Sequence, residues 1–336
     1  MSLISVQDLT IRFATDEGLI TAVEDVSFDI APGEILGLVG ESGSGKSVTA
    51  KALMRLNGGN TRYDERSTIT LGVPGEAPVE VLSLKRERDM GPIRGGAVSM
   101  IFQEPMASFA PAITVGQQMV EQLLIHTKMT KSQARKHAIE MLDRVGIPDP
   151  ARRFEQYAFE FSGGMRQRAM IAMALSTSPK LLIADEPTTA LDVTIQAQVI
   201  DLMKDLVREF GMGILFITHD LGVIAQTADK VAVMYLGKLV ETGTVRQVIR
   251  TPGHPYTRGL IDALPKLSDL DAPLTPVPGD IPSPLNRPAG CVFHTRCPLA
   301  KPGLCDAVVP QAETLPDGQS VACLFAQDIY SKEGAA

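Results

Sequence analysis

The chain has 336 residues, of which 44% are hydrophobic and 21% charged, and its formal net charge is −7. This composition is typical of a globular protein with a substantial core, and the acidic balance argues against binding to nucleic acid. No apolar run approaches the roughly 18 residues of a membrane-spanning helix, and the start of the chain lacks a signal-peptide pattern, so we expect a cytoplasmic protein.

The N-terminal part of the chain has the pattern of β-structure. The first 30 residues alternate between apolar and polar positions, which predicts two paired strands with a turn at 16–18. Residues 33–40 form a short apolar run of buried-strand type, followed by a glycine-rich loop and a helix through Leu56. Residues 57–96 are rich in glycine, proline and charge, so we expect an irregular or β-hairpin insertion there.

From residue 97 onward, strand-like apolar runs alternate with helical patterns. The predicted strands cover 97–103, 181–185, 213–218 and 230–237. The predicted helices lie within 112–160, after residue 164, and over 194–210 and 221–228. Within the first of these regions, Thr130 to Gln133 has the pattern of a capping box. The alternation predicts an α/β fold with a mainly parallel sheet covered by helices.

GESGSGKS is the strongest motif in the chain, and it lies between a predicted buried strand and a helix. The glycines let backbone N–H groups surround phosphate oxygens. Lys46 would neutralise the β- and γ-phosphates, and the Ser47 hydroxyl would bind Mg²⁺. The motif therefore predicts a nucleotide-binding loop made by Gly40, Glu41, Ser42, Gly43, Ser44, Gly45, Lys46, Ser47 and Val48.

Polar residues end three of the predicted strands. Asp185 and Glu186 follow an apolar run in LLIADEP, where Asp185 would hold Mg²⁺ and Glu186 would orient or deprotonate an attacking water. Taken alone, the pair also fits a solvated strand end. Gln103 and His219 end two other strands, and a structural histidine is the alternative to a functional one.

FSGGMRQR (161–168) predicts a helix that begins with Ser162 as its cap. Gly163 and Gly164 would leave the first N–H groups of this helix open to an anion. From these residues alone, an ordinary helix start is the more economical interpretation.

The chain resembles the nucleotide-binding subunit of an ATP-binding cassette (ABC) transporter. The resemblance rests on six features in this order: GESGSGKS, Gln103, FSGGMRQR, LLIADEP, TALD at 189–192 and His219. Four further segments are similar to those of oligopeptide and dipeptide importer ATPases: IFQEPM, ADEPTTALDVTIQAQ, FITHDLGV and HPYTRGL. The resemblance implies a RecA-like P-loop cassette over 1–251, with an N-terminal antiparallel β region and a helical subdomain at about 106–160. An extension would follow over 252–336.

The resemblance also implies roles for individual residues. Phe13 would stack on adenine, although a core aromatic is the alternative, and Gln103 would complete the Mg²⁺ shell. Glu186 would be the general base, and His219 would contact the γ-phosphate. Two cassettes would enclose two ATP molecules. The residues serving the partner's side of that interface would be Ser162, Gly163, Gly164, Met165 and Asp192.

The expected function is ATP hydrolysis that energises uptake of peptides or a related solute. The implied partners are a second cassette, identical or homologous, two membrane permeases and, indirectly, an extracytoplasmic binding protein. The chain would then lie peripherally on the cytoplasmic face of the membrane. The alternatives are a soluble ABC ATPase that acts outside transport and a regulatory module that does not hydrolyse ATP.

All four cysteines lie after residue 290, within an extension whose segment 252–316 holds more than half of the 23 prolines. We therefore expect the extension to be loop-rich. The cysteine spacing, C-x5-C-x7-C-x17-C, contains no CxxC pair and is a weak zinc signal. Four thiolates suit a [4Fe–4S] cluster, which ranks first, ahead of Zn²⁺ and of no metal. The ligands would be Cys291, Cys297, Cys305 and Cys323.

Overall fold

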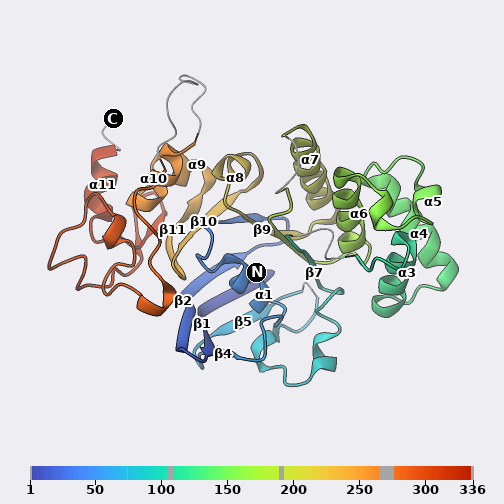
Figure 1. Cartoon of the computed structure of the whole chain (residues 1–336), viewed down its shortest axis with the longest axis horizontal. Coiled ribbons are helices and arrows are strands. Elements are labelled where there is room, and N and C mark those ends of the chain that lie inside the picture. The colour runs from blue at the N-terminus through green and yellow to red at the C-terminus, as the bar shows by residue number, and fades with distance from the viewer. Residues whose placement is uncertain (1, 74, 104–108, 189–192, 265–275, 334–336) are drawn as a thin grey trace. The chain divides into compact units, whose positions relative to one another are not determined.

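A computed structural model describes residues 2–73, 75–103, 109–188, 193–264 and 276–333 (Figure 1). The chain divides into two compact units, each assembled from several stretches. The first unit comprises 1–4, 29–34 and 70–217, and the second comprises 5–28, 35–69 and 218–336. Among the described helices, none has the length and apolar character needed to cross a bilayer.

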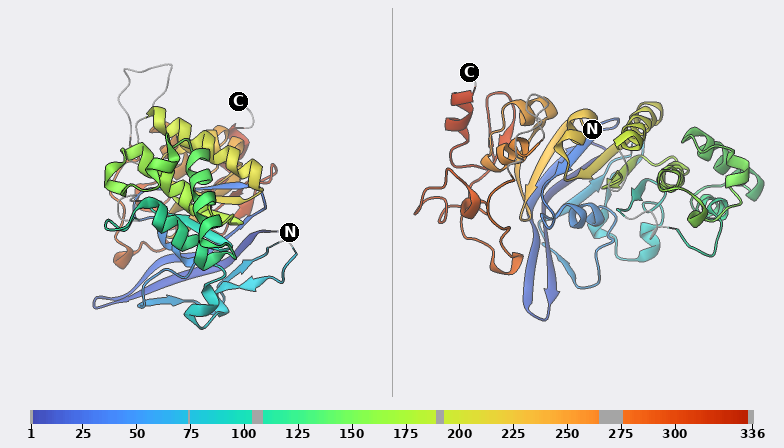
Figure 2. Two further views of the ribbon diagram at one scale, coloured as in Figure 1. Left: turned by 90° about the vertical axis from the view of Figure 1, so that its right-hand side faces the viewer. Right: turned by 45° about the horizontal axis from the view of Figure 1, so that its top comes forward.

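The second unit contains the predicted N-terminal strand pair. β1 (Ile4–Thr15) pairs with β2 (Gly18–Ile30), and both views of Figure 2 show them as a long blue ribbon pair. β4 (Thr61–Tyr63) pairs antiparallel with β1, with Phe13 opposite Thr61. The alternating apolar positions therefore bury one side of this pair, as the pattern predicts.

A mixed sheet forms the centre of the second unit. β3 (Ile35–Val39) runs parallel to β10 (Lys230–Tyr235), and β11 (Lys238–Thr244) runs antiparallel to β10. The prediction of one strand over 230–237 is wrong at its end, because Leu236 and Gly237 adopt positive φ angles and reverse the chain. α1 (Lys46–Ala52) and α8 (Leu221–Thr227) belong to the same unit.

The C-terminal extension has more regular structure than its proline content predicts. It contains α10 (Pro255–Asp262) and α11 (Ala326–Glu333), and α9 (Val245–Arg250) precedes it. β13 (Ser320–Val321) pairs with β11 and with β12 (Glu313–Thr314), so the extension adds two short strands to the mixed sheet. The division at residue 251 stays a prediction, since both sides of it lie in one compact unit.

The first unit contains a buried parallel sheet and a group of helices. β7 (Val98–Ile101), β8 (Leu181–Asp185) and β9 (Gly213–Thr218) pair in parallel, as predicted. The helices are α3 (Val115–His126), α4 (Lys131–Arg144), α5 (Pro150–Arg153), α6 (Gly163–Leu175) and α7 (Val193–Phe210). α4 opens with the predicted Thr130–Gln133 capping box and packs against α3 and α6.

The 57–96 insertion is short-stranded, as expected. β5 (Thr68–Leu71) pairs antiparallel with β6 (Val79–Glu80), and 3₁₀ turns follow at Val81–Ser83 and Glu87–Met90.

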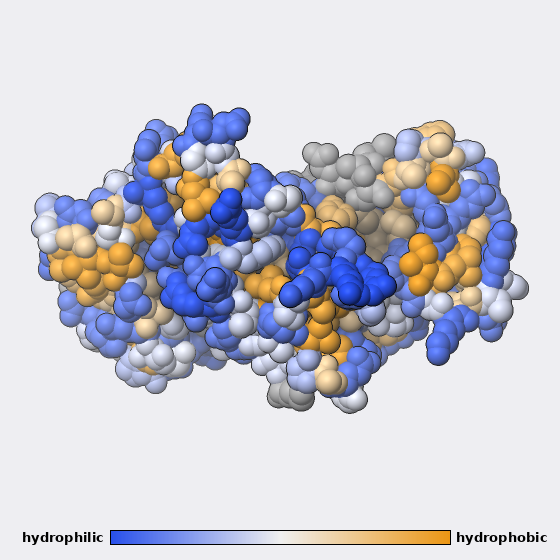
Figure 3. Space-filling view, turned by 90° about the horizontal axis from the view of Figure 1, so that it is seen from below, coloured by the Kyte–Doolittle hydropathy of each residue, from blue (hydrophilic) through white to orange (hydrophobic). Residues whose placement is uncertain are grey.

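On the face shown in Figure 3, separate hydrophobic patches interrupt a largely hydrophilic surface. Exposed apolar side chains of the described part include Leu124, Ile125 and Phe159 in the first unit and Leu299, Val308 and Val309 in the second.

Candidate nucleotide site

The predicted phosphate-binding loop connects β3 to α1 in the second unit. All five residues of β3 are buried, and the chain leaves the strand at Gly40, whose φ is 154°. Gly43 and Gly45 have φ angles of 78° and 104°. A Cβ atom at Gly40 would lie 2.1 Å from the carbonyl oxygen of Met234, and one at Gly45 would lie 2.7 Å from that of Ala22. The loop conformation therefore requires glycine at both positions.

Lys46, at the first position of α1, points its ammonium group back into the loop. Its Nζ donates hydrogen bonds to the carbonyl oxygens of Gly40 at 2.7 Å and Glu41 at 2.9 Å, and contacts the Ser44 hydroxyl at 3.4 Å. The side chain is buried, so a positive charge is enclosed by backbone atoms. A bound anion could replace the loop carbonyls as the hydrogen-bond acceptor of Lys46, so the arrangement suits anion binding.

The other loop residues differ in exposure. Ser42 and Gly43 are exposed, Ser44 is buried, and Ser47 and Val48 are half-buried. Phe13 on β1 is also half-buried, so its ring is not part of a closed core. The nucleotide contacts predicted for these residues stay predictions.

Glu41 makes contacts that no sequence pattern indicated. Its carboxylate accepts two hydrogen bonds from Arg296, at 2.7 and 3.1 Å, and its backbone N–H donates to the Tyr256 hydroxyl at 2.9 Å. Arg296 lies 255 residues further along the chain, so local patterns carry no signal of this pairing. HPYTRGL, which contains Tyr256, resembles importer sequences but does not indicate this contact.

In the first unit, the structure brings Gln103 and Glu186 together. Both follow the carboxyl ends of neighbouring parallel strands, β7 and β8, and the Gln103 amide donates to Glu186 Oε2 at 3.0 Å. Asp185, the last residue of β8, is buried. Glu186 has a φ of 47°, and its N–H donates to the Ile217 carbonyl at 2.9 Å. A positive φ at a non-glycine residue is costly and is found preferentially at functional sites.

His219 follows β9 at an exposed position. The next residue, Asp220, caps α8 by accepting hydrogen bonds from the N–H groups of Gly222 and Val223. The cap fixes the backbone next to His219. Its predicted contact with a γ-phosphate stays a prediction.

The FSGGMRQR segment forms the predicted helix start. The Ser162 hydroxyl caps α6 by accepting from the Met165 N–H at 3.3 Å, while Phe161 is buried just before it. Ser162 and Gly163 are exposed, and apart from its chain neighbours and the backbone of its own helix no described atom lies within 4 Å of a Cβ built on Gly163. A Cβ built on Gly164 would lie 3.2 Å from the Ile195 side chain. The predicted TALD segment, including Asp192, lies outside the described residues, as do 106–108 of the predicted helical subdomain.

The four cysteines are free thiols in the second unit. Burial, together with the charge of neighbouring thiolates, raises the pKa of Cys291, Cys297 and Cys323, and that of Cys323 reaches about 11. The thiols are therefore close enough to affect one another. However, among the described residues no group of three or more His, Cys, Asp or Glu side chains could hold a metal ion as placed. The structure does not support the predicted iron–sulfur or zinc site in this arrangement.

Comparison with known proteins covers both parts of the chain. The ABC transporter family model matches residues 23–189, and the model for the C-terminal region of oligopeptide/dipeptide transporters matches residues 240–305. The dipeptide transport ATP-binding protein DppD of Bacillus subtilis is 48% identical over 322 residues, which cover 95% of this chain and 93% of that protein. The oligopeptide transport ATP-binding protein OppD of Salmonella typhimurium is 48% identical over 321 residues, covering 96% and 93%.

Solved structures give the same fold. The ATP-binding cassette MJ0796, in a dimeric post-hydrolysis state bound to ADP and Pi, matches with a TM-score of 0.63 at 24% identity. The match covers 72% of this chain and 99% of that one. CbiO1 of Clostridium perfringens, part of an ABC transporter complex, matches with a TM-score of 0.61 at 23% identity, covering 74% and 90%. The chain therefore belongs to the ATP-binding proteins of ABC transporters and is an ATPase of that family, with the C-terminal region of oligopeptide/dipeptide transporters.

Proposed function

We propose that this ATPase energises the import of peptides through a membrane permease. The main support for this proposal is the similarity to proteins named for dipeptide and oligopeptide transport, which extends over more than nine-tenths of the chain, including the C-terminal region. A putative peptide import ATP-binding protein of Brucella abortus, 46% identical over 333 residues, supports the same assignment. A soluble ABC ATPase acting outside transport and a regulatory module without hydrolysis are the less favoured functions.

In this proposal, the loop from Gly40 to Val48 binds the phosphates of ATP. The Lys46 ammonium group then donates its hydrogen bonds to phosphate oxygens in place of the loop carbonyls. Ser47, Gln103 and Asp185 would hold Mg²⁺, which would supply neutralisation of phosphate charge. The Gln103 amide, 3.0 Å from Glu186 Oε2, orients that carboxylate, whose other oxygen accepts a proton from the attacking water. His219 contacts the γ-phosphate, and Phe13 stacks on adenine.

A second cassette, identical or homologous, completes the working unit. The exposed start of α6, with the open space around Gly163, supports a role in binding the nucleotide held by the partner. Ser162, Gly163, Gly164 and Met165 would make that contact. Asp192 would lie at the same interface.

The helical region is the proposed docking surface for the permeases. A cavity of about 880 Å³ is lined by residues of α3 and α4 and by Phe154 and Glu155, which follow α5. Leu124 and Ile125 on its rim are 43% and 68% exposed, and Lys131, Arg135 and Glu155 add charge. This combination suits a short amphipathic helix on the cytoplasmic side of a membrane protein. The chain would then act at the cytoplasmic face, with a substrate-binding protein on the opposite side.

The docking proposal is tested by co-purification of the chain with its two permease subunits. Ile125→Asp should abolish co-purification while leaving the thermal midpoint of the free chain unchanged, because the side chain is exposed. Leu285→Asp, at a 45% exposed position of the extension, is the matched control and should co-purify normally. If Ile125→Asp also co-purifies like the wild type, the permeases bind elsewhere on the chain. A wild-type chain that does not co-purify with permease subunits would contradict the proposed role in a transporter.

We also propose a [4Fe–4S] cluster on Cys291, Cys297, Cys305 and Cys323, with Zn²⁺ as the second candidate. The confinement of all four cysteines to the extension is what favours it, and their side chains would have to reorient to become ligands. Anaerobically purified protein should contain iron and acid-labile sulfide. A colourless preparation with stoichiometric zinc would identify the other metal, and protein without either would rule out both.

A further inference from the structure

All three hydrogen-bonding groups of Glu41 are engaged, and two of them are bound by the C-terminal extension. The carbonyl accepts from Lys46 Nζ at 2.9 Å. The N–H donates to the Tyr256 hydroxyl at 2.9 Å, and the carboxylate accepts from both terminal nitrogens of Arg296. Glu41 is the second residue of the phosphate loop, so the extension directly contacts the segment that surrounds Lys46.

Arg296 is itself rigidly held. Its side chain is only 3% exposed, and it donates to the carbonyl oxygens of Pro278 at 2.9 Å and Val277 at 3.0 Å. Its guanidinium also lies over the rings of Tyr235 and Phe293. A planar guanidinium fixed on several sides offers the carboxylate a preorganised, two-point contact.

Tyr256 is equally constrained. Its side chain is fully buried, and its ring packs against Tyr235 at 4.7 Å and Phe293 at 5.3 Å between centroids. The hydroxyl is therefore presented to the loop by a closed aromatic cluster. Its hydrogen bond to the Glu41 N–H cannot be kept if the extension detaches.

We propose that Arg296 and Tyr256 are positioning residues of the nucleotide site, which hold the phosphate loop in its binding conformation through Glu41. The extension thereby sets the nucleotide affinity of the cassette, because a loop ordered in advance spends less binding free energy on ordering. The inference rests on the proposed role of this loop in ATP binding.

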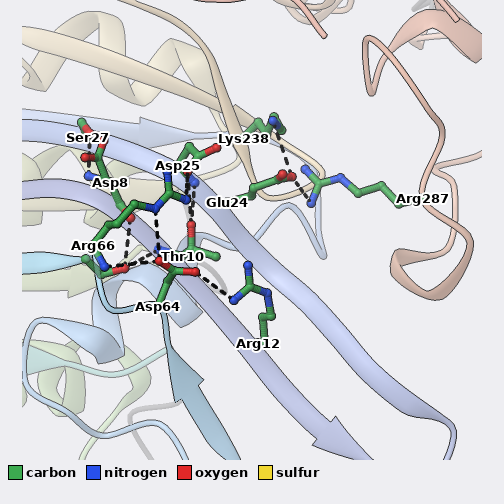
Figure 4. A network of polar contacts seen from close by, with 11 residues as sticks. Asp8, Thr10, Arg12, Glu24, Asp25, Ser27, Asp64, Arg66, Lys238 and Arg287 are labelled. Atoms are coloured by element: carbon green, nitrogen blue, oxygen red, sulfur yellow. Dashed lines mark hydrogen bonds and ion pairs between the residues drawn. The ribbon is translucent and has the colours of Figure 1, made fainter. Parts of the chain in front are cut away.

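A second ion pair between the extension and the rest of the unit provides a matched control. Arg287 contacts Glu24 on β2 at 2.8 Å, next to Lys238, as Figure 4 shows. Arg287 is 16% exposed, so it is also a largely buried arginine of the extension. Within the described part of the chain its ion pair is with Glu24 and not with the phosphate loop, so its loss should affect stability without affecting nucleotide affinity.

The experiment measures the Kd of a fluorescent ATP analogue and the thermal midpoint for the full chain. Arg296→Met should raise the Kd about tenfold, since charged hydrogen bonds are among the stronger ones. Arg296→Lys should raise it less, because lysine keeps the charge but not the two-point contact. Tyr256→Phe, which keeps the ring, should also weaken binding. Arg287→Met should lower the thermal midpoint and leave the Kd at the wild-type value.

Glu41→Gln tests the same contact from the loop side and leaves every residue of the extension in place. It should weaken binding like Arg296→Met, and the double variant should be no weaker than the single ones, since both remove one interaction. If Arg296→Met fails to fold, the Kd of Glu41→Gln tests whether this contact sets the nucleotide affinity. Wild-type affinity in Glu41→Gln and Tyr256→Phe would overturn the inference while the proposed function stands. A wild-type chain that binds no ATP would refute both.

Discussion

Two glycine-containing segments of this protein use glycine for opposite reasons. In the phosphate loop, Gly40 and Gly45 have positive φ angles, and a side chain at either position would collide with backbone atoms. At the start of α6, Gly163 has no described neighbour within 4 Å of an added Cβ. The loop glycines are therefore required by the chain's own fold, whereas Gly163 is not.

A small residue that its own fold does not need suggests a requirement outside the chain. Ser162 and Gly163 are exposed at the start of α6, where a helix favours an anion, and the proposed second cassette would bring one. The comparison thus separates a site that the chain builds alone from one that works only in an assembly. The following substitutions test this separation.

Gly40→Ala should have the largest effect. The new methyl group would lie 2.1 Å from the Met234 carbonyl oxygen at a φ of 154°, which we expect to cost about 3 kcal/mol or more. Nucleotide binding and the thermal midpoint should both fall. Gly43→Ala is the control, because it has a φ of 78° but open space, and should cost only about 1 kcal/mol. Equal losses of stability and nucleotide binding in the two variants would show that the backbone shifts to avoid the collision at position 40.

Gly163→Ala should affect only the assembled complex. Alanine is favoured over glycine in a helix, so the free energy of unfolding of the isolated chain should stay the same or rise by up to about 1 kcal/mol. Its own nucleotide Kd should not change. Hydrolysis in the complex with a second cassette should fall roughly tenfold or more, because the methyl group blocks approach to the partner's nucleotide. Wild-type hydrolysis in that complex would remove the distinction between the two segments.

Ser162→Ala should cause a small loss of stability that is measurable in the isolated chain. It removes the hydroxyl that caps α6, a loss typically worth about 1 kcal/mol, which chemical denaturation can measure. Ser162→Asp should restore most of that stability, since aspartate is also a good cap. If alanine costs nothing, the 3.3 Å contact to Met165 contributes little to the helix.

Much of the fold was predictable because its signals are local. The alternation in β1 and β2, the buried runs of β3, β8 and β9, and the Thr130 capping box all depend on neighbours in the sequence. The end of β10 was missed because the run continues through Leu236 and Gly237, where only the backbone angles reveal a turn. β12 and β13 are two residues long and depend on pairing with the distant β11.

The candidate site divides in the same way. The loop glycines and Lys46 were predictable because phosphate binding imposes a fixed local spacing. The Gln103–Glu186 contact followed from two strand ends at one sheet edge. The pairing of Glu41 with Arg296 spans 255 residues and depends on how the extension packs, which no motif encodes.

Reconstitution with permeases and binding protein in lipid vesicles tests the proposed function most directly, by measuring ATP-dependent peptide uptake with wild-type chain and with Glu186→Gln. The glutamine variant should bind ATP with wild-type affinity, because it keeps the side-chain shape. Its hydrolysis should fall by roughly 10² or more with loss of the base, and peptide uptake should fall with it. Peptide uptake at the wild-type rate by Glu186→Gln, or none by the wild type with ATP present, would contradict the proposal that hydrolysis at Glu186 drives peptide import.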